Sequence, residues 1–161
     1  MSMPDYVTDV WLFITTSTAQ YAKTAAGLQL ELALPGQVAL LETARETLRR
    51  GLPAQFHWTP ASEGTVNWTS ASFVPADVSS LKLKIVGDSG DAWLPSSVWV
   101  IVNSQVSGYQ VFSAYPAWPS NQWFSSDPKE GSPAYALQIR SLAAKTVAVG
   151  DVPIVGAAQP A

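Results

Sequence analysis

Cysteine is absent from the 161 residues, and histidine occurs only once, as His57. These absences exclude disulfide frameworks, thiolate nucleophiles and zinc sites built from Cys or from several His residues. Charged residues make up only 13% of the chain, and nine Lys and Arg against twelve Asp and Glu leave a net charge of −3. Because duplex nucleic acid is bound through basic surfaces, this balance predicts no nucleic-acid partner.

Long apolar segments and catalytic signatures are also missing. The longest apolar runs, such as residues 98–102, are far shorter than the roughly 20 residues of a membrane-spanning helix. The first residues have neither a basic nor an apolar region, so no signal peptide is expected and the cellular compartment stays open. The chain has no Gly-x-Ser-x-Gly motif and no phosphate-binding glycine loop, which favours a role other than catalysis.

Alternation of apolar and polar residues is the main pattern that is present. Residues 28–34 place leucine at every second position, and residues 81–86 alternate apolar residues with lysine, as in strands with one buried face. Residues 6–16 and 98–102 are rich in β-branched and aromatic residues, which favour strands. Turn residues separate these segments, so the sequence predicts an all-β fold, an antiparallel β-sandwich of two sheets. The residues predicted to face its core are Val10, Leu12, Ile14, Leu28, Leu30, Leu32, Leu34, Leu81, Leu83, Ile85, Val98, Val100, Val102 and Val111.

One segment departs from the strand pattern. Leu41, Ala44 and Leu48 recur at helical spacing, and two arginines before Gly51 resemble a helix end. The sequence therefore predicts at most one short helix, near residues 39–50.

The last residues differ in composition from the rest. Residues 1–141 are assigned to a single sandwich domain, and residues 142–161 to a C-terminal arm rich in Ala, Val and Pro. Residues 147–155 contain five Val and Ile residues and one charge, and such an apolar strip usually marks a contact. The arm is expected to lie along its own sandwich or to join a neighbouring subunit in a homo-oligomer; a linker to a further domain is the alternative.

The segment Gly87-Asp88-Ser89-Gly90-Asp91 is a candidate metal site. Asp88 and Asp91 could offer carboxylate oxygens to a hard cation such as calcium, which is the one cofactor the sequence suggests. Two carboxylates alone form a weak site, and a turn that uses Asp and Gly for their backbone tolerance is the favoured alternative.

Seven tryptophans stand out in a chain of this length. Trp11, Trp58, Trp68 and Trp99 lie in strand-like segments, where packing in the core is expected. The others lie in loops, where an aromatic ring either contacts a ligand such as a lipid surface or a sugar, or folds back and plugs the end of the sandwich. Both interpretations are open for Trp93, and the plug is favoured for Trp123. The candidate ligand-binding residues are Trp93, Leu94, Trp118 and Trp123.

The order of these motifs resembles that of PLAT domains, the polycystin, lipoxygenase and α-toxin family. Five segments carry the resemblance, in family order: Tyr6–Thr16, Gln29–Gly36, Arg49-Arg50-Gly51 followed by Phe56, Leu83–Val102, and Asn121-Gln122-Trp123-Phe124. The resemblance implies a β-sandwich of two four-stranded sheets. It also implies a module that binds membranes, lipids or partner proteins, in some members through calcium held by loops at one end.

Three functions are therefore considered. The first is a non-catalytic binding module for a lipid or membrane surface or a partner protein, assisted by calcium. The second is a carbohydrate-binding, lectin-like sandwich in which loop tryptophans stack on sugar rings. The third is a small metal-independent enzyme with its site inside the sandwich or between subunits.

Overall fold

The computed structural model describes residues 4–69, 72–87 and 92–140 of the chain. Strands dominate this part, and its one helical element is a single 3-10 turn. The described residues contain no helix long and apolar enough to cross a membrane. The elements are β1 (Val7–Thr16), β2 (Gly27–Leu34), β3 (Gln37–Glu42), β4 (Pro53–Trp58), β5 (Thr65–Val66), η1 (Pro75–Asp77), β6 (Ser80–Val86), β7 (Pro95–Ser104), β8 (Gly108–Tyr115) and β9 (Ala134–Leu137).

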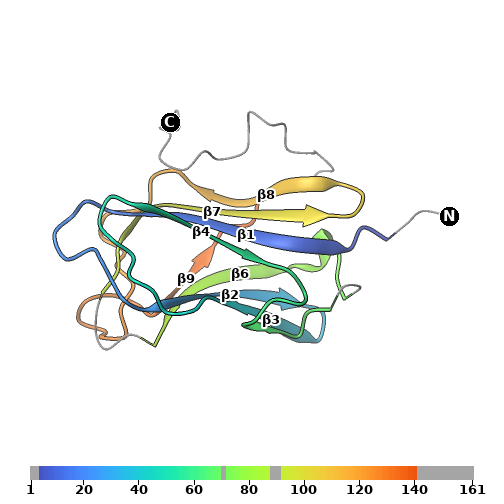
Figure 1. Ribbon diagram of the computed structural model, residues 1–161, viewed down its shortest axis with the longest axis horizontal. Helices are drawn as coiled ribbons and strands as arrows, with labels where there is room; N and C mark the ends of the chain where they lie inside the picture. Colours follow the sequence, from blue (N-terminus) through green and yellow to red (C-terminus); the bar gives the residue numbers. More distant parts are fainter. Residues whose placement is uncertain (1–3, 70–71, 88–91, 141–161) are drawn as a thin grey trace.

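The strands form two antiparallel sheets that face each other (Figure 1). The first sheet has the order β4-β1-β7-β8, and the second has the order β5-β3-β2-β6-β9. The predicted β-sandwich is confirmed. The second sheet has five strands rather than the implied four because the two-residue strand β5 pairs with β3.

The predicted inward faces are confirmed in every strand but β8. Leu81, Leu83 and Ile85 are at most 3% exposed, and Lys82 on the same strand is exposed. Cross-strand pairs such as Leu30 with Leu83 align the inward positions of β2 and β6, which fixes the register of this sheet.

Val111 is buried as predicted, but on the outer side of its sheet. It pairs with Ile101 next to a bulge in β7–β8, and neither residue belongs to the central core. Phe112, one residue later, is fully buried and fills the inward position. The bulge therefore changes which residue of β8 faces the core.

The predicted helix near residues 39–50 is wrong. Its first part is strand β3, which follows a tight turn at Gly36 (φ 74°) and pairs with β2 from Leu34 and Gln37 onward. Leu41 is buried in that strand and Leu48 in an isolated bridge to Thr24, whereas Ala44 between them is exposed. Pairing with β2 outweighs the local helical propensity because it buries the apolar face of β3.

Candidate functional site

The structure buries Trp93 and Leu94, two of the four candidate ligand-binding residues. Trp93 is 0% exposed, its Nε1 donates a hydrogen bond to Thr16 Oγ1 at 2.9 Å, and its ring centroid lies 5.1 Å from that of Phe124. The backbones of Trp93 and Phe124 exchange two further hydrogen bonds. Of the two interpretations left open for Trp93, the structure therefore supports the plug and contradicts a ring exposed to a ligand. A large ring whose N–H finds a partner is more stable inside the sandwich, where it plugs one end.

Trp118 and Trp123, the other two candidates, lie at the same end. Trp118 is 6% exposed, its Nε1 donates to the Gln122 carbonyl, and its ring stacks on Phe124 at 5.5 Å. Trp123 is half-buried and packs against the core, as the plug interpretation predicts. The four candidate residues are thus brought together, but three of them lie inside the protein.

Asp88 and Asp91, the candidate metal ligands, lie outside the described residues. Gly87, just before them, has a φ of 67°, and the Arg45 guanidinium lies where a Cβ would project. The Arg45 side chain therefore packs against the backbone where this loop begins. In the part of the chain that the structure describes, no three His, Asp or Glu side chains could together hold a metal ion.

Two loops at this end join to form a surface that we call the basic tip, residues 17–26 and 43–52. Thr24 and Leu48 exchange backbone hydrogen bonds, and the Gly51 N–H donates to the Thr16 carbonyl at 2.8 Å. The Leu94 N–H donates to the Ala22 carbonyl, so the first loop also lies over the buried Trp93 segment. These contacts hold together two loops that are distant in sequence.

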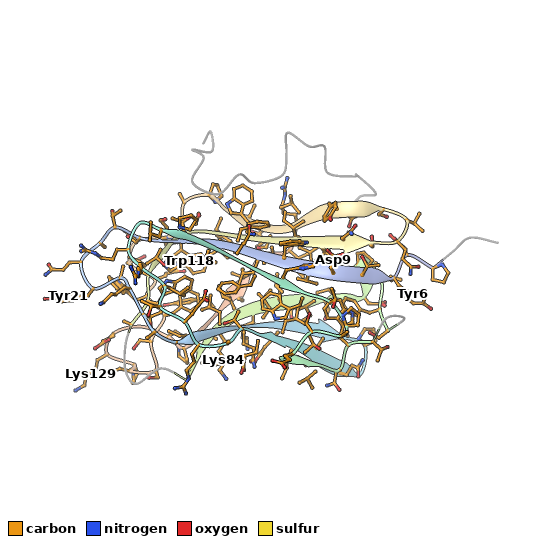
Figure 2. All side chains as sticks on the ribbon, in the orientation of Figure 1. Tyr6, Asp9, Tyr21, Lys84, Trp118 and Lys129 are labelled. Atoms are coloured by element: carbon orange, nitrogen blue, oxygen red, sulfur yellow. The ribbon has the colours of Figure 1, made fainter. Side chains whose placement is uncertain are left out.

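The basic tip exposes two large apolar side chains. Tyr21 is 78% exposed and Leu52 is 52% exposed. Figure 2 shows Tyr21 at the left-hand extremity of the molecule. Its φ of 66° is rare for a residue that is not glycine, so the loop holds the ring outward at a cost in backbone energy.

The same tip is positively charged. It contains Lys23, Arg45, Arg49 and Arg50 against the single acid Glu46, a net charge of +3 in a chain of −3. Lys23 and Arg49 adjoin the bridge between Thr24 and Leu48, which brings their two loops side by side. Lys23, Arg49 and Arg50 form no ion pair with any described residue. The tip therefore combines exposed apolar groups with a net positive charge.

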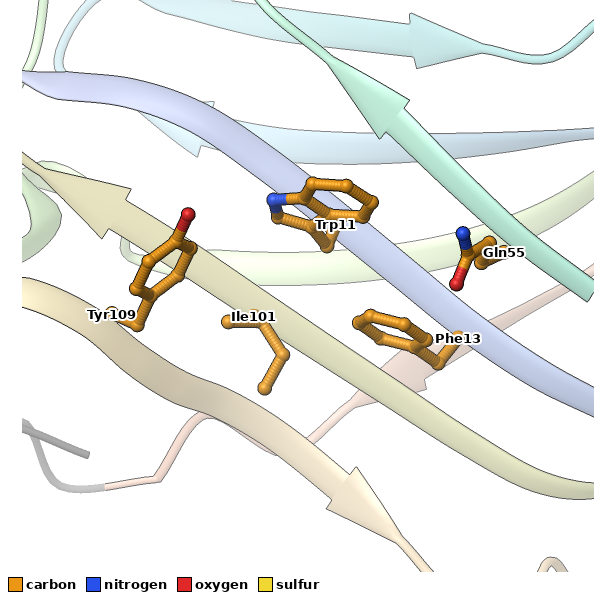
Figure 3. Close-up of a pocket in the computed structure, with 5 residues that line it drawn as sticks. All are labelled: Trp11, Phe13, Gln55, Ile101 and Tyr109. Atoms are coloured by element: carbon orange, nitrogen blue, oxygen red, sulfur yellow. The ribbon is translucent and has the colours of Figure 1, made fainter. Parts of the chain in front are cut away.

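A second candidate surface, the aromatic hollow, lies on the outer face of the first sheet. It is a concavity of about 320 Å³ lined by Trp11, Phe13, Gln55, Ile101 and Tyr109 (Figure 3). Trp11 and Ile101 are paired across β1 and β7, and both point away from the core. Its volume is at the lower limit of typical ligand pockets, and one of its five lining side chains is polar.

Asp9 and His57 form a polar rim beside Trp11. His57 Nε2 lies 3.1 Å from Asp9 Oδ2, and the imidazole stacks on the Trp11 ring with centroids 3.9 Å apart. Burial alone would raise the pKa of Asp9, but hydrogen bonds from Thr8, Asn103, Trp11 and His57 outweigh it and lower this pKa below its usual range. The carboxylate is thus ionised and already bonded to protein groups.

Comparison with known proteins supports the fold. No family model matches the chain, and no curated protein matches it in sequence. The α-toxin of Clostridium absonum superposes with a TM-score of 0.63 at 16% identity, over 86% of this chain and 33% of the toxin. The α-toxin of Clostridium perfringens gives 0.59 at 17% identity, over 85% of this chain and 33% of the toxin. A lipoxygenase variant in complex with arachidonate gives 0.53 at 15% identity, over 83% of this chain and 16% of that one.

This is the fold of a PLAT-like domain. The resemblance seen in the motif order is confirmed at the level of fold. The PLAT-like chain spans a third or less of the length of these structures.

Sequence reasoning missed both surfaces of the PLAT-like sandwich. From its residue type, Trp11 is expected in the core, because tryptophan is large and apolar. Yet Trp11 and Phe13 alternate with the inward residues of β1, and this period predicts that they face outward. Trp99 is half-buried and outward-facing for the same reason, whereas Trp58 and Trp68 are buried as expected. The basic tip had a weaker signal, two nearby arginines in one loop.

Proposed function

We propose that this PLAT-like chain is a non-catalytic binding module that attaches to an anionic lipid surface through the basic tip. The observation that carries the proposal is the exposure of Tyr21 and Leu52 beside Lys23, Arg49 and Arg50. Aromatic and aliphatic side chains enter the interfacial layer of a bilayer, while neighbouring basic side chains are attracted to anionic headgroups.

The charge distribution supports attachment in one orientation. The two loops of the tip are positive although the chain as a whole is negative, so an anionic surface attracts the tip. Each basic residue near such a surface contributes about 1 kcal/mol. Lys23, Arg49 and Arg50 would together contribute about 3 kcal/mol, equivalent to on the order of 100-fold in partitioning.

We also propose that calcium assists the attachment of the tip to an anionic lipid surface. Asp88 and Asp91 belong to the connection that reaches Trp93, and loop 17–26 lies over the Trp93 segment. A calcium ion held by the two aspartates would add positive charge near the tip. It would also offset the repulsion between these carboxylates and anionic lipid.

The test is flotation of the purified protein with phosphatidylcholine vesicles, with and without phosphatidylserine, in calcium and in chelator. We expect binding to the vesicles that contain phosphatidylserine, and a loss of about 100-fold when Lys23, Arg49 and Arg50 are all changed to Gln. Tyr21→Asn removes the ring while keeping a residue that tolerates positive φ, and should weaken binding as well.

Two variants serve as matched controls. Val106→Gln removes another exposed apolar side chain, 62% exposed, from the hairpin at the opposite end of the sandwich. Lys82→Gln removes one positive charge from the outer side of the second sheet. Both should bind vesicles as the unaltered protein does. Equal binding of all variants, or no preference for phosphatidylserine, would contradict attachment through the tip.

A further inference from the structure

The aromatic hollow has no role in the proposed attachment to lipid, since it lies on the outer face of a sheet rather than among the loops. The strands of the first sheet each contribute to its lining: Trp11 and Phe13 from β1, Gln55 from β4, Ile101 from β7 and Tyr109 from β8. Tyr109 is 45% exposed, so its ring presents apolar surface to the solvent beside this concavity. A surface of this kind usually binds an apolar partner.

The chemistry of this face restricts its partner. Strands β1, β4, β7 and β8 contain no Lys, Arg or Glu, so the face offers no positive charge to an anionic ligand. Its carboxylate, Asp9, already accepts hydrogen bonds from Thr8, Trp11 and Asn103, and lies within bonding distance of His57. Asp9 therefore has few lone pairs left to accept hydrogen bonds from a ligand rich in hydroxyl groups. An uncharged aliphatic partner fits this face best.

The course of the described chain leads toward the hollow. The Ser113 hydroxyl donates to the Gln138 carbonyl, and two residues later the Arg140 N–H donates to the Phe112 carbonyl. The chain therefore runs antiparallel to β8, along the edge that β7 does not occupy. Tyr109 lies further along β8 in the same direction.

The segment that follows has the matching chemistry. Residues 147–155 contain five Val and Ile residues and a single charge, Asp151. The six residues 141–146 can span about 20 Å when extended, at roughly 3.3 Å each. The distance from β8 across to β1 is two strand spacings, about 10 Å, so the segment can reach the hollow. Pro153 has no N–H, which favours contact through side chains over addition of a regular strand.

We propose that residues 147–155 of the same chain occupy the aromatic hollow and place their Val and Ile side chains against Trp11, Phe13 and Tyr109. The arm is then an intramolecular cover for an apolar face that would otherwise remain in water. Any external ligand of this face must displace the arm, which makes the arm a competitor for the site.

The absence of cysteine provides a direct test. In the double variant Gln55→Cys with Ile154→Cys only one intramolecular disulfide can form, and Gln55 lines the hollow without contributing an aromatic ring. The matched control combines Ile154→Cys with Val38→Cys, an exposed position on the second sheet. Under a mild oxidant we expect the pair at positions 55 and 154 to form its intramolecular disulfide on the order of ten-fold faster, or more, than the pair at positions 38 and 154. Docking of the arm raises the effective concentration of the thiol at position 154 near the thiol at position 55.

Two outcomes would overturn the proposal. Equal cross-linking rates for both pairs would mean that the arm does not dock in the hollow. Cross-linked dimers that form in proportion to protein concentration would assign the hollow to the arm of a second copy.

A second measurement does not depend on cross-linking. Ile154→Asp should release the arm and increase the fluorescence of the apolar dye bis-ANS several-fold, whereas Ala158→Asp adds the same charge outside residues 147–155 and should not. An unchanged dye signal in Ile154→Asp would also overturn the proposal.

Discussion

Replacement of Trp93 by Ala should severely destabilise the fold, although its place in a loop suggests a dispensable residue. The side chain is fully buried, and truncation of a buried Trp costs about 3–5 kcal/mol. Thr16, also fully buried, would lose the Trp93 N–H as a hydrogen-bond donor, which adds about 1 kcal/mol or more. The sum, about 4–6 kcal/mol, reaches the lower end of the total stability of a typical domain, about 5–15 kcal/mol.

Urea unfolding followed by circular dichroism measures this loss as a lower midpoint at an unchanged slope. If Trp93→Ala does not fold, Trp93→Phe retains most of the apolar area and removes the hydrogen bond to Thr16. A double-mutant cycle of Trp93→Phe with Thr16→Val should give a coupling of about 1 kcal/mol. A loss below about 1 kcal/mol for Trp93→Ala would refute the plug and return Trp93 to the surface.

Three further predictions concern the backbone, pH and calcium. Gly64→Ala should lower the free energy of unfolding by at least about 2 kcal/mol, because φ is 82° and a Cβ would collide with the Glu42 carbonyl. Gly36→Ala, with φ 74° and open space around it, should lower it by about 1 kcal/mol. Equal shifts in melting temperature for the two variants would contradict this difference. Folding lowers the pKa of Asp9, so the ionised carboxylate stabilises the fold fully above about pH 4, and this stabilisation is lost as the pH falls through the folded pKa. The urea midpoint should therefore decline more steeply in acid for the unaltered protein than for Asp9→Asn. Millimolar calcium should raise the melting temperature, and changing Asp88 and Asp91 to Asn should abolish the increase; identical melts in calcium and in chelator would reject the metal site.

The strands could be predicted because each carries its own signal. In β2 and β6 every second residue is apolar, and this period alone defines which side is buried. The segment 39–50 could not be predicted in the same way. Its local composition favours a helix, and its state depends on β2, a partner that the local pattern does not specify.

The candidate site was predictable only in part. The burial of Trp93 depends on Thr16 and Phe124, which lie far away on either side in the sequence. The basic tip depends on the bridge between Thr24 and Leu48, which joins two loops that a single-sequence pattern treats as unrelated. Surfaces assembled from distant segments require the register of the sheets, and that register is a property of the whole fold.

The two proposed surfaces lie in different parts of the structure, so a substitution in one should leave the function of the other unchanged. The basic tip lies among the loops that follow β1 and β3, whereas the hollow lies midway along β1 and β7. Substitution of Tyr21 by Asn should therefore leave the cross-linking rate between positions 55 and 154 unchanged, and release of the arm by Ile154→Asp should leave the preference for phosphatidylserine vesicles intact. If release of the arm instead strengthens binding to pure phosphatidylcholine, the uncovered aromatic face itself enters the bilayer. The hollow would then be a second lipid contact, independent of charge.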